Sequence, residues 1–509
     1  MQSSTALAQA LIGARNLPSG LPSIKSRSLE ARAYEQLKPY PIFYFIDWKT
    51  EDRGPLPRCL PLVKAITWRG ARWLFGKTPQ IVVAGNSKLE EFLRAMWIKN
   101  RMPARAVAMA RSGALDGGVV LKYAYDDAAK TPLSIQTLSL VDECRLYYNP
   151  HNRDELLMAR VQYPYFDAAE GKTYFYREEW TAEEQVVYKP LDQELMAIGT
   201  GGVQDPDTFD GWIEESREPN VFGRIPMTHI RNVETDDTWG SGDLWDLFRV
   251  FDRVNLTYHL MDRSNQFDSE VNPLYIDLNV NEADVNRPLE PGQPLDLKSD
   301  NAEGGGKGDV KFPPTGNALR PAMMDYAKDL RKQIMDAAST IFIDQHEFSN
   351  KGNLTTAVLE QLYQPLIELT LEKRKTYGDN GVIEFFKNVA LGLAEAGVSD
   401  FAVNESDEDS YTAQLKWQPF FDLSQDERTA AMGRVQEEET AGYVTHDRAI
   451  EEVALIEGRE DVAALKEELA AEPKPSPTET LGGGEQDASL DEMEKTIQGL
   501  TRVAGKGAE

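Results

Sequence analysis

The stretch from Gly240 to Ile343 constrains the fold most strongly, because it predicts two long helices separated by an irregular segment rich in proline and glycine. Apolar residues recur every three or four positions between Asp243 and Asp268, which places them on one face of an α-helix. They are Leu244, Leu247, Phe248, Phe251, Val254, Tyr258 and Met261. At 1.5 Å per residue this helix would be ~39 Å long. Leu256 and Leu260 fall on its other side, so we expect apolar contacts on two sides.

The second helix is predicted to begin at Pro321, since proline suits the first position of a helix. Its apolar face consists of Met323, Tyr326, Ala327, Leu330, Ile334, Ala337 and Ile341. Two matched helices with an excursion between them predict an antiparallel pair. The plainest interpretation is a helical hairpin inside a large core.

Composition limits the class of protein. With 509 residues, of which 41% are hydrophobic, the chain is long enough for several domains with buried cores. Its formal net charge of −28 argues against wrapping by DNA, which requires lysine and arginine to neutralise phosphates. Cys59 and Cys144 are too few for a disulfide framework, which indicates a reducing, cytosolic origin. No apolar run is long enough to span a membrane, and the N-terminus lacks the pattern of a signal peptide.

The first half of the chain predicts a mixed α/β region. Residues 1–30 are rich in serine, glycine and proline, and we expect a mobile arm there. Helices are predicted at 61–75, after the capping-box pattern Ser87-Lys88-Leu89-Glu90, and from Pro103 to about Ser112. From Val119 to Tyr188 the sequence predicts successive β-strands with turn residues between them.

Beyond the second long helix, residues 344–353 are polar except for Phe348. A helix is predicted to follow from Thr355 or Thr356. Pro365 inside it predicts a kink near residues 361–365, because proline removes one hydrogen bond and clashes with the preceding turn. A second capping box at Ser424 opens a helical end in which residues 425–469 hold 13 acidic and 5 basic side chains.

The motifs of enzymes and metal sites are mostly missing. Gly76-Lys77-Thr78 is like part of a phosphate-binding P-loop, but five residues rather than four separate it from Gly70, and a helix precedes it. None of the five histidines forms a metal-binding pair, and there is no nucleophile elbow. We therefore predict no catalytic residues, no metal and no cofactor. The alternative is a soluble multidomain enzyme that uses a nucleotide in an unknown reaction.

Several motifs occur in a familiar order. Phe222-Gly223-Arg224-Ile225-Pro226 is followed by Asn232, by Gly240-Ser241-Gly242-Asp243-Leu244 and by Asp252-Arg253-Val254-Asn255. Gly113-x-x-Asp116-Gly117-Gly118 precedes a strand, and Trp417-Gln418-Pro419 precedes Ser424. Over roughly residues 30–460 this order resembles the portal, or head-to-tail connector, proteins of tailed bacteriophages. Gly242 is inserted where that family often has Gly-Ser-Asp directly.

The resemblance implies an α+β portal fold assembled as a ring. Stem packing would involve Leu244, Leu247, Phe251, Val254, Tyr258, Leu330, Ile334 and Ile341, and Pro365 would kink the long helix. In chain order the parts would be a flexible arm (1–30), an α/β wing with a β-rich second half (31–239), a first stem helix (240–269), a small β-containing clip (270–320), a second stem helix (321–343), a tunnel loop (344–354), a kinked helix returning to the wing (355–423), a crown (424–469) and a disordered acidic tail (470–509).

The resemblance further implies a function in packaging and ejection of a viral genome. About twelve copies, assembled in the host cytoplasm, would form a ring at one capsid vertex of the virion, with double-stranded DNA passing along the axis. The implied partners are the terminase, the major capsid protein and adaptor or tail proteins, and no membrane. Glu347, Phe348, Ser349, Asn350 and Lys351 would lie nearest the DNA. Since a basic lining would hold phosphates, we expect the wall to be acidic.

Overall fold

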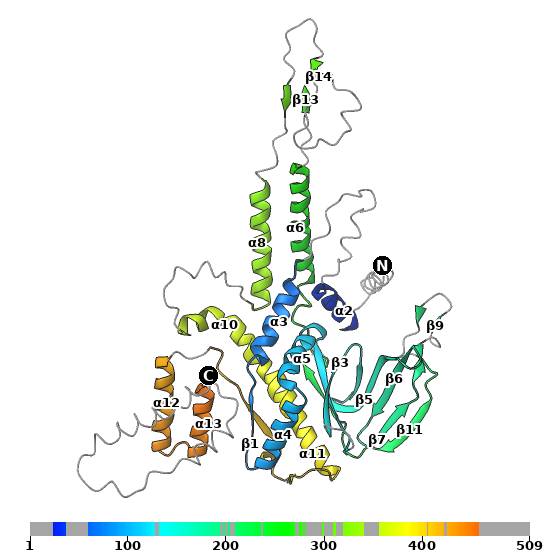
Figure 1. Cartoon of the computed structure of the whole chain (residues 1–509), viewed down its shortest axis with the longest axis vertical. Helices are drawn as coiled ribbons and strands as arrows, with labels where there is room; N and C mark the ends of the chain where they lie inside the picture. Colours follow the sequence, from blue (N-terminus) through cyan, green and yellow to red (C-terminus); the bar gives the residue numbers. More distant parts are fainter. Residues whose placement is uncertain are drawn as a thin grey trace, which may run out of the picture. The chain divides into compact units, whose positions relative to one another are not determined.

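A computed structural model describes residues 24–36, 60–127, 132–193, 197–198, 202–203, 209–235, 238–269, 274–276, 278–279, 298–299, 309–311, 319–340, 356–404, 406–421 and 425–457. The chain divides into two compact units, Met1–Asp422 and Leu423–Glu509. The first unit holds all of the strands described and most of the helices (Figure 1). The mixed content of helices and antiparallel sheets confirms the predicted α+β class.

The strands of the first unit form several antiparallel sheets. The largest has the order β11-β7-β6-β5-β4, with β8 also paired to β6. Its strands are β4 (Cys144–Asn149), β5 (Asn152–Asp167), β6 (Lys172–Trp180), β7 (Glu184–Tyr188), β8 (Leu191–Asp192) and β11 (Glu214–Pro219). A three-stranded sheet has the order β12-β2-β3, made of β12 (Met227–Arg231), β2 (Gly118–Tyr125) and β3 (Leu133–Ser139). The β-rich region predicted up to Tyr188 is therefore confirmed.

Smaller strand pairs complete the list. β1 (Gln80–Val83) pairs with β17 (Ala413–Lys416), more than 300 residues later in the chain, so that the return segment closes on the first part of the unit. The remaining pairs are β9 (Ala197–Ile198) with β10 (Gly202–Val203), β13 (Leu274–Ile276) with β16 (Asp309–Lys311), and β14 (Leu278–Asn279) with β15 (Lys298–Ser299). The last two pairs lie in the connection between the two long helices, where a small β-containing segment was expected.

The helices of the first unit follow the predicted order. They are α2 (Ile24–Glu35), α3 (Leu62–Phe75), α4 (Ser87–Lys99), α5 (Met102–Asp116), α6 (Phe248–Ser269), α8 (Leu319–Ala337), α10 (Thr356–Lys373) and α11 (Glu384–Glu395). A π-helical segment, Arg374–Ile383, joins α10 directly to α11. The second unit contains α12 (Gln425–Thr440) and α13 (His446–Glu457), which pack against each other.

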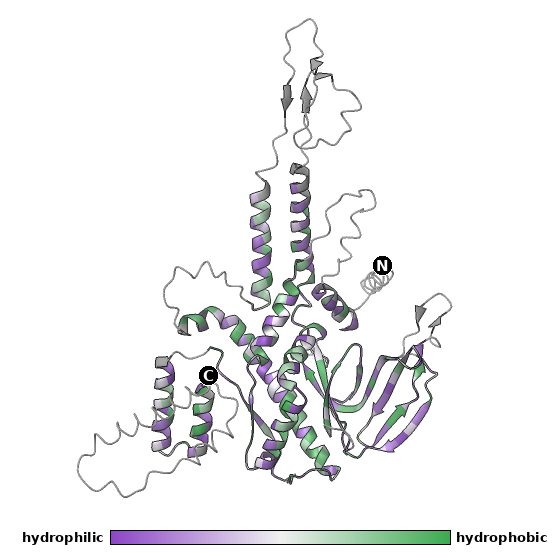
Figure 2. Cartoon of the chain, in the orientation of Figure 1, coloured by the Kyte–Doolittle hydropathy of each residue, from purple (hydrophilic) through white to green (hydrophobic). Residues whose placement is uncertain are grey.

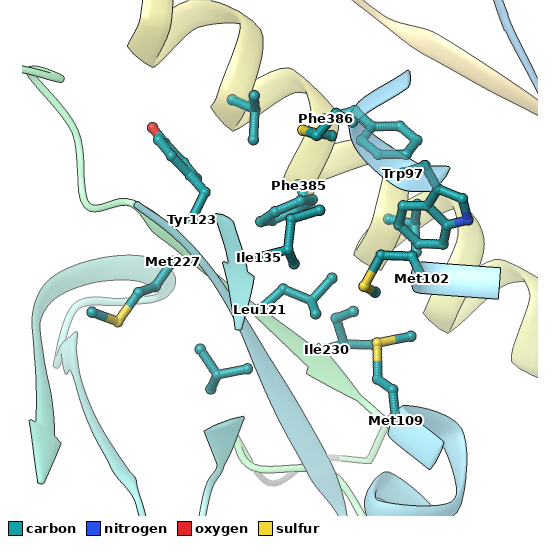
Figure 3. Packing of buried hydrophobic residues seen from close by; sticks show 14 of the residues in the cluster. Trp97, Met102, Met109, Leu121, Tyr123, Ile135, Met227, Ile230, Phe385 and Phe386 are labelled. Atoms are coloured by element: carbon teal, nitrogen blue, oxygen red, sulfur yellow. The ribbon is translucent and has the colours of Figure 1, made fainter. Parts of the chain in front are cut away.

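The main core lies between the three-stranded sheet and the helices α4, α5 and α11 (Figure 3). Trp97 of α4 meets Phe386 of α11 edge to face, with 5.4 Å between ring centroids. Tyr123 of β2 meets Phe385 of α11 in the same way at 6.1 Å. Aromatic pairs prefer this geometry because the positive edge of one ring faces the negative face of the other. The core therefore fixes α11 against the sheet.

Two predictions about the first hundred residues need correction. Helix α2 begins at Ile24, so the mobile arm predicted for residues 1–30 is wrong for residues 24–30. The reason is tertiary, because Ala31 and Tyr34 on this helix are buried in an apolar cluster. The capping box at Ser87 is also wrong. Asn86 caps α4 by accepting from the Leu89 N–H at 3.2 Å, and the Glu90 carboxylate accepts instead from the Val83 N–H at 2.9 Å.

The long helix predicted to kink at Pro365 is continuous from Thr356 to Glu395. Pro365 lies inside α10, and the irregular part of the helix is the π-helical segment Arg374–Ile383. Figure 1 shows a bend along α10. A π-helical segment inside an α-helix is uncommon and marks functional positions more often than chance. The sequence offered no signal for it.

Candidate functional site: the α6–α8 helix pair and its base

The helices α6 and α8 run side by side (Figure 1), and polar and apolar residues alternate along both of them (Figure 2). Their facing sides belong to one buried apolar cluster that also includes residues of α2, α3 and α5. From the two long helices this cluster takes Phe248, Phe251, Val254, Leu330 and Ile334, with Leu244 and Trp245 just before α6 and Ala338 just after α8. We call it the helix-pair cluster. The pair is thus attached to the rest of the unit at its base.

Most of the residues predicted to pack the stem lie together. Leu244, Phe251, Val254, Leu330 and Ile334 are members of the helix-pair cluster, and Leu247 and Tyr258 pack against it partly buried. Ile341 lies outside the described residues. The face of α8 differs slightly from the prediction, since Ala338 rather than Ala337 is buried and Tyr326 is 44% exposed.

Apolar side chains also point away from the pair. Leu260 of α6 is 44% exposed and Met324 of α8 is 49% exposed, while Leu256 is half-buried. The sequence predicted apolar residues on two sides of α6, and a single copy of the chain buries only one side completely.

Helix α6 begins at Phe248, five residues later than the predicted start at Asp243. Residues Asp243 to Leu247 form turns instead. The carboxylate of Asp243 does not cap the helix, because other parts of the chain use it. Its Oδ1 accepts from Asn232 Nδ2 at 2.7 Å, and its Oδ2 accepts from Lys373 Nζ at 2.5 Å.

Asn232, Asp243, Lys373 and Tyr377 form a buried polar group at the base of the helix pair, which we call the polar base. The Lys373 and Asp243 side chains are 4% and 10% exposed. The Tyr377 hydroxyl donates to Asn232 Oδ1 at 3.0 Å, and burial raises the pKa of this tyrosine well above its ordinary value. The group connects the segment before α6, the end of β12 and the π-helical segment. An ion pair with so little exposure is strongly destabilised when one partner is removed, because the other charge stays buried.

Two glycines of the motifs noted in the sequence, Gly113 and Gly240, allow neighbouring segments to approach each other closely around the polar base. A Cβ atom on Gly113 would lie 2.0 Å from the Tyr377 hydroxyl, so no other residue fits beneath the polar base. Gly240 has a φ of +79°, and a Cβ there would lie 2.6 Å from the carbonyl oxygen of Gly117. Both positions therefore require glycine for steric reasons.

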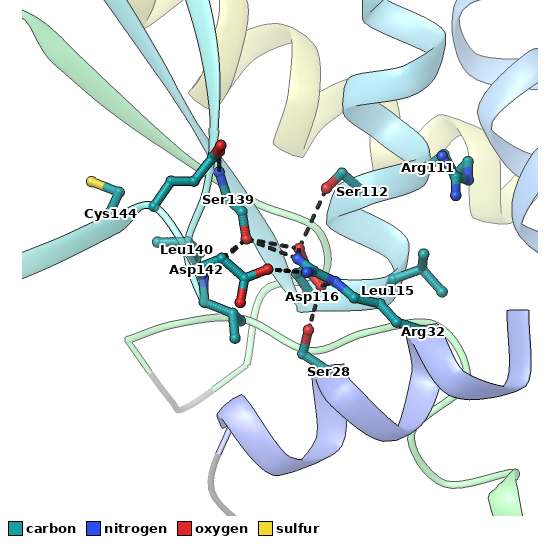
Figure 4. A network of polar contacts seen from close by, with 12 residues as sticks. Ser28, Arg32, Arg111, Ser112, Leu115, Asp116, Ser139, Leu140, Asp142 and Cys144 are labelled. Atoms are coloured by element: carbon teal, nitrogen blue, oxygen red, sulfur yellow. Dashed lines mark hydrogen bonds and ion pairs between the residues drawn. The ribbon is translucent and has the colours of Figure 1, made fainter. Parts of the chain in front are cut away.

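A second buried network centres on Asp116, whose side chain is fully buried (Figure 4). Its carboxylate accepts from Arg32 Nε at 2.9 Å and from the Ser139 hydroxyl at 3.2 Å, and Ser28 also donates to it. Arg32 forms a further ion pair with Asp142. The network connects α2 to the end of α5 and to the turn after β3.

The Asp252-x-x-Asn255 motif attaches α6 to the N-terminal helices. The Tyr34 hydroxyl of α2 donates to Asp252, and its ring stacks on Phe248 with 5.2 Å between centroids. The Leu60 N–H, just before α3, donates to Asn255 Oδ1 at 3.0 Å. Both polar residues of the motif thus face the protein.

The helices themselves carry nearly balanced charge. Helix α8 holds Arg320, Lys328, Arg331 and Lys332 beside Asp325, Asp329 and Asp336, and α6 holds Arg249, Arg253 and Arg263 beside Asp252, Asp262 and Asp268. Neither helix therefore has an acidic excess in its sequence, and the acidic wall stays a prediction. The acidic surplus of the chain lies elsewhere, for instance in residues 425–469.

Other predicted site residues divide into two groups. Glu347, Phe348, Ser349, Asn350 and Lys351 lie outside the described residues. Lys77 of the P-loop-like sequence follows α3 and donates from Nζ to the carbonyl oxygen of Pro419 at 3.0 Å. Within the described residues, no group of three or more histidine, cysteine, aspartate or glutamate side chains could hold a metal ion. In the same part of the chain no helix is long and apolar enough to cross a membrane.

Sequence reasoning missed the partners in these networks. Lys373 lies 130 residues from Asp243, and Arg32 lies 84 residues from Asp116. The sequence identified Asp116, Asn232, Asp243, Asp252 and Asn255 only as parts of motifs. Nothing in one sequence indicates which distant cation meets which carboxylate.

Comparison with known proteins identifies one matching family. The family described as "Phage portal protein, SPP1 Gp6-like" matches residues 58–475. Among solved structures, one similar chain comes from the neck of an empty GTA particle computed with C6 symmetry, with 13% identity, a TM-score of 0.35, and coverage of 78% of this chain and 90% of that chain. Another comes from the neck of a native GTA particle computed with C12 symmetry, with 12% identity, a TM-score of 0.36, and coverage of 77% and 88%. No curated protein matches the sequence.

Proposed function

The chain belongs to the SPP1 Gp6-like family of phage portal proteins, and we propose that about twelve copies of it form a ring around double-stranded DNA. The family is a structural one, so the nucleotide-using enzyme considered from the sequence is set aside. The observation that carries the proposal is the family match over residues 58–475, which includes the whole helix pair. The exposed apolar side chains of that pair support it, because a ring supplies a neighbour on each side.

The parts of the chain receive the following proposed roles. Residues 31–239 form the wing, α6 and α8 with their flanking residues (240–269 and 321–343) form the stem, and residues 270–320 form the clip. The tunnel loop is 344–354, the long helix and the return to the wing cover 355–423, and the crown is 424–469. Residues 1–23 and 470–509 remain proposed as an arm and a tail.

The stem would surround the DNA. Helix α6 has 22 residues, so it spans ~33 Å at 1.5 Å per residue. Duplex DNA carries one charge per ~1.7 Å, so about 19 phosphate charges would lie within that length. The nearly balanced charge of α6 and α8 supports passage of DNA, because it provides no surplus of cations that would bind phosphates tightly.

The ring would lie at one vertex of the capsid, and its assembly would take place in the host cytoplasm. We propose that the clip binds the terminase during packaging and then an adaptor or tail protein, and that the major capsid protein surrounds the wing. The polar base supports a mechanical role. It connects the stem to the long helix, so that a force on one element is transmitted to the other.

The mass of the native particle tests the proposal. We expect one dominant species of twelve 57.1 kDa chains in native mass spectrometry, and rings in negative-stain images. A ring with one copy more or fewer would correct only the number. A protein that stays monomeric or dimeric at every concentration, and also in infected cells, would overturn the proposal.

A further inference from the structure

Helix α3 carries a groove of unusual composition for this acidic chain. Its walls are Lys64, Ala65, Trp68, Arg69, Arg72 and Trp73, and its volume is about 560 Å³. We call it the cationic groove. Helix α3 contains Lys64, Arg69 and Arg72 and no carboxylate, whereas the whole chain has a net charge of −28. A local surplus of cations therefore lies in a molecule that is negative overall.

The two tryptophan rings of the groove are held in place by neighbouring side chains. The guanidinium groups of Arg72 and Arg111 lie 5.3 and 5.2 Å from the centre of the Trp68 ring. Arg111 is itself fixed by Glu35 of α2, whose carboxylate accepts from its Nε at 2.5 Å. Such cation–π contacts orient the ring. The groove thus presents a rigid aromatic surface.

Trp73 is fixed from the other side. Its ring stacks on Tyr363 of α10 at 5.2 Å and on Phe420 at 5.7 Å between centroids. Lys64 and Arg72 are exposed at the groove, while Trp68 and Trp73 are half-buried. Within the part of the chain that the structure describes, neither Lys64 nor Arg72 forms an ion pair with a carboxylate.

This combination is typical of a protein interface. Tryptophan and arginine are enriched among the residues that contribute most to protein–protein binding, and rigid side chains lose little entropy on association. Duplex DNA is a poorer fit. Its affinity comes from neutralised phosphates spread along the helix, whereas the groove is small and the chain as a whole repels a polyanion.

We propose that the cationic groove binds a carboxylate-rich surface of a second copy of this chain, the next one around the ring. Contacts in a ring join two different surfaces, so each copy needs a patch and a complement to it. The groove supplies a cationic aromatic patch, and the acidic surplus of the chain supplies the complement. This inference rests on the proposed ring.

The double variant Lys64→Glu/Arg72→Glu tests the groove directly. Both side chains are exposed, so the fold should survive, and circular dichroism and the thermal transition check that it does. We expect the protein concentration needed for ring assembly to rise at least tenfold, because two attractions become repulsions. Lys64→Arg/Arg72→Lys keeps the charges and should assemble nearly normally. The matched control is Lys88→Glu/Lys99→Glu, which reverses two exposed charges on α4 and should form rings like the wild type.

Mixing the reversed variant with wild-type chains before assembly gives a second readout. A copy with a reversed groove still offers its acidic surface to a wild-type groove, but it cannot accept the following copy. We therefore expect open arcs in place of closed rings at a one-to-one ratio. A variant that was merely misfolded would be left out, and wild-type rings would remain.

The possible results separate the two proposals. If the reversed variant forms rings of normal mass at the normal protein concentration, the proposed role of the groove is wrong and the proposed ring is unaffected. If circular dichroism shows that the reversed variant is folded, wild-type rings remaining in the mixture would also contradict the proposed role of the groove. A wild-type protein that never forms rings would overturn both. If the reversed variant does not fold, Lys64→Gln/Arg72→Gln replaces it, with a smaller expected rise of about threefold to tenfold.

Discussion

Asn232 uses both of its side-chain N–H donors and its side-chain oxygen inside the protein. The amide donates to the Ser241 carbonyl oxygen at 2.9 Å and to Asp243, and the oxygen accepts from Tyr377. A buried polar side chain that is satisfied in this way holds a single geometry, because any other residue leaves a donor or an acceptor unpaired. The position of asparagine in the motif therefore has a structural cause at the base of the α6–α8 helix pair.

The environment of His229 predicts how the stability of the fold changes at acidic pH. The residue is half-buried with its Nε2 shielded from solvent, its Nδ1 lies 2.8 Å from the Tyr148 hydroxyl, and burial, with a smaller contribution from Arg231, lowers its pKa to about 3. The unfolded chain would bind a proton near the ordinary pKa of 6.5. Between about pH 6.5 and pH 3 the unfolded state therefore holds more protons, and stability falls as pH falls, by up to about 1.4 kcal/mol per pH unit.

The measurement compares wild type with His229→Gln in urea at pH 7, 5.5 and 4. We expect the unfolding midpoint of the wild type to fall more steeply with acid than that of the variant. His151→Gln, at an exposed histidine, is the control and should follow the wild type. Equal slopes for wild type and His229→Gln would mean that His229 is accessible to protons in the folded protein.

At the scale of elements, the sequence predicted the existence of the helices better than their ends. The stripe from Leu244 to Tyr258 correctly indicated the first long helix, because its apolar side faces a core. The predicted start of this helix at Asp243 was five residues too early, because the Asp243 carboxylate binds distant partners and does not cap the helix. The π-helical segment has no local signature for the same reason, since Tyr377 and Thr376 within it bond to Asn232.

The pairing of Lys373 with Asp243 predicts that the long helix and the α6–α8 helix pair are stabilised together. Lys373→Met would leave the Asp243 carboxylate buried with Asn232 as its remaining described partner. We expect a loss of roughly 3–5 kcal/mol in stability, measured by chemical denaturation. Adding Asp243→Asn should recover much of the loss, because it removes the buried charge.

The control for Lys373→Met is a substitution of Lys375, two residues further along the chain. Lys375 is exposed, so Lys375→Met should change stability by less than about 0.5 kcal/mol. If Lys373→Met behaved like Lys375→Met, the ion pair would have no part in holding the α6–α8 helix pair to the long helix. If the double variant were no better than the single one, the loss would come from packing of the lysine side chain instead.

At the scale of the whole molecule, the order of motifs identified the family and the composition could not. Several of the residues in those motifs, such as Gly113, Gly240 and Asn232, mark places where distant segments meet closely, and this explains why their order along the chain carries information. The acidic net charge did not locate the acidic surfaces, because charge is a property of the whole chain. The cationic groove on α3 was missed for this reason.

The prediction about the proposed tunnel loop, residues 344–354, is tested in the assembled ring. Lys351 is the single lysine or arginine in residues 344–354. We expect Lys351→Glu to leave the mass of the ring unchanged and to alter the rate of DNA packaging or the retention of the genome, because in the proposed tunnel loop a cation near the phosphates would become an anion. Packaging assays with purified heads measure the first effect, and DNA content per particle measures the second.

Lys351→Arg retains the positive charge and should package DNA like the wild type. Packaging that did not change in Lys351→Glu would show that this side chain does not approach the DNA. A loss of rings in that variant would instead give the loop a structural role.

The helix-pair cluster sets an order of events during synthesis on the ribosome. It joins Ala31 and Tyr34, which are made early, to Ile334 and Ala338, which emerge roughly 300 residues later. At about 5–20 residues per second, the nascent chain holds these apolar side chains without their final partners for about 15–60 s. Chaperones that recognise exposed apolar segments therefore have a defined interval in which to act on the nascent chain.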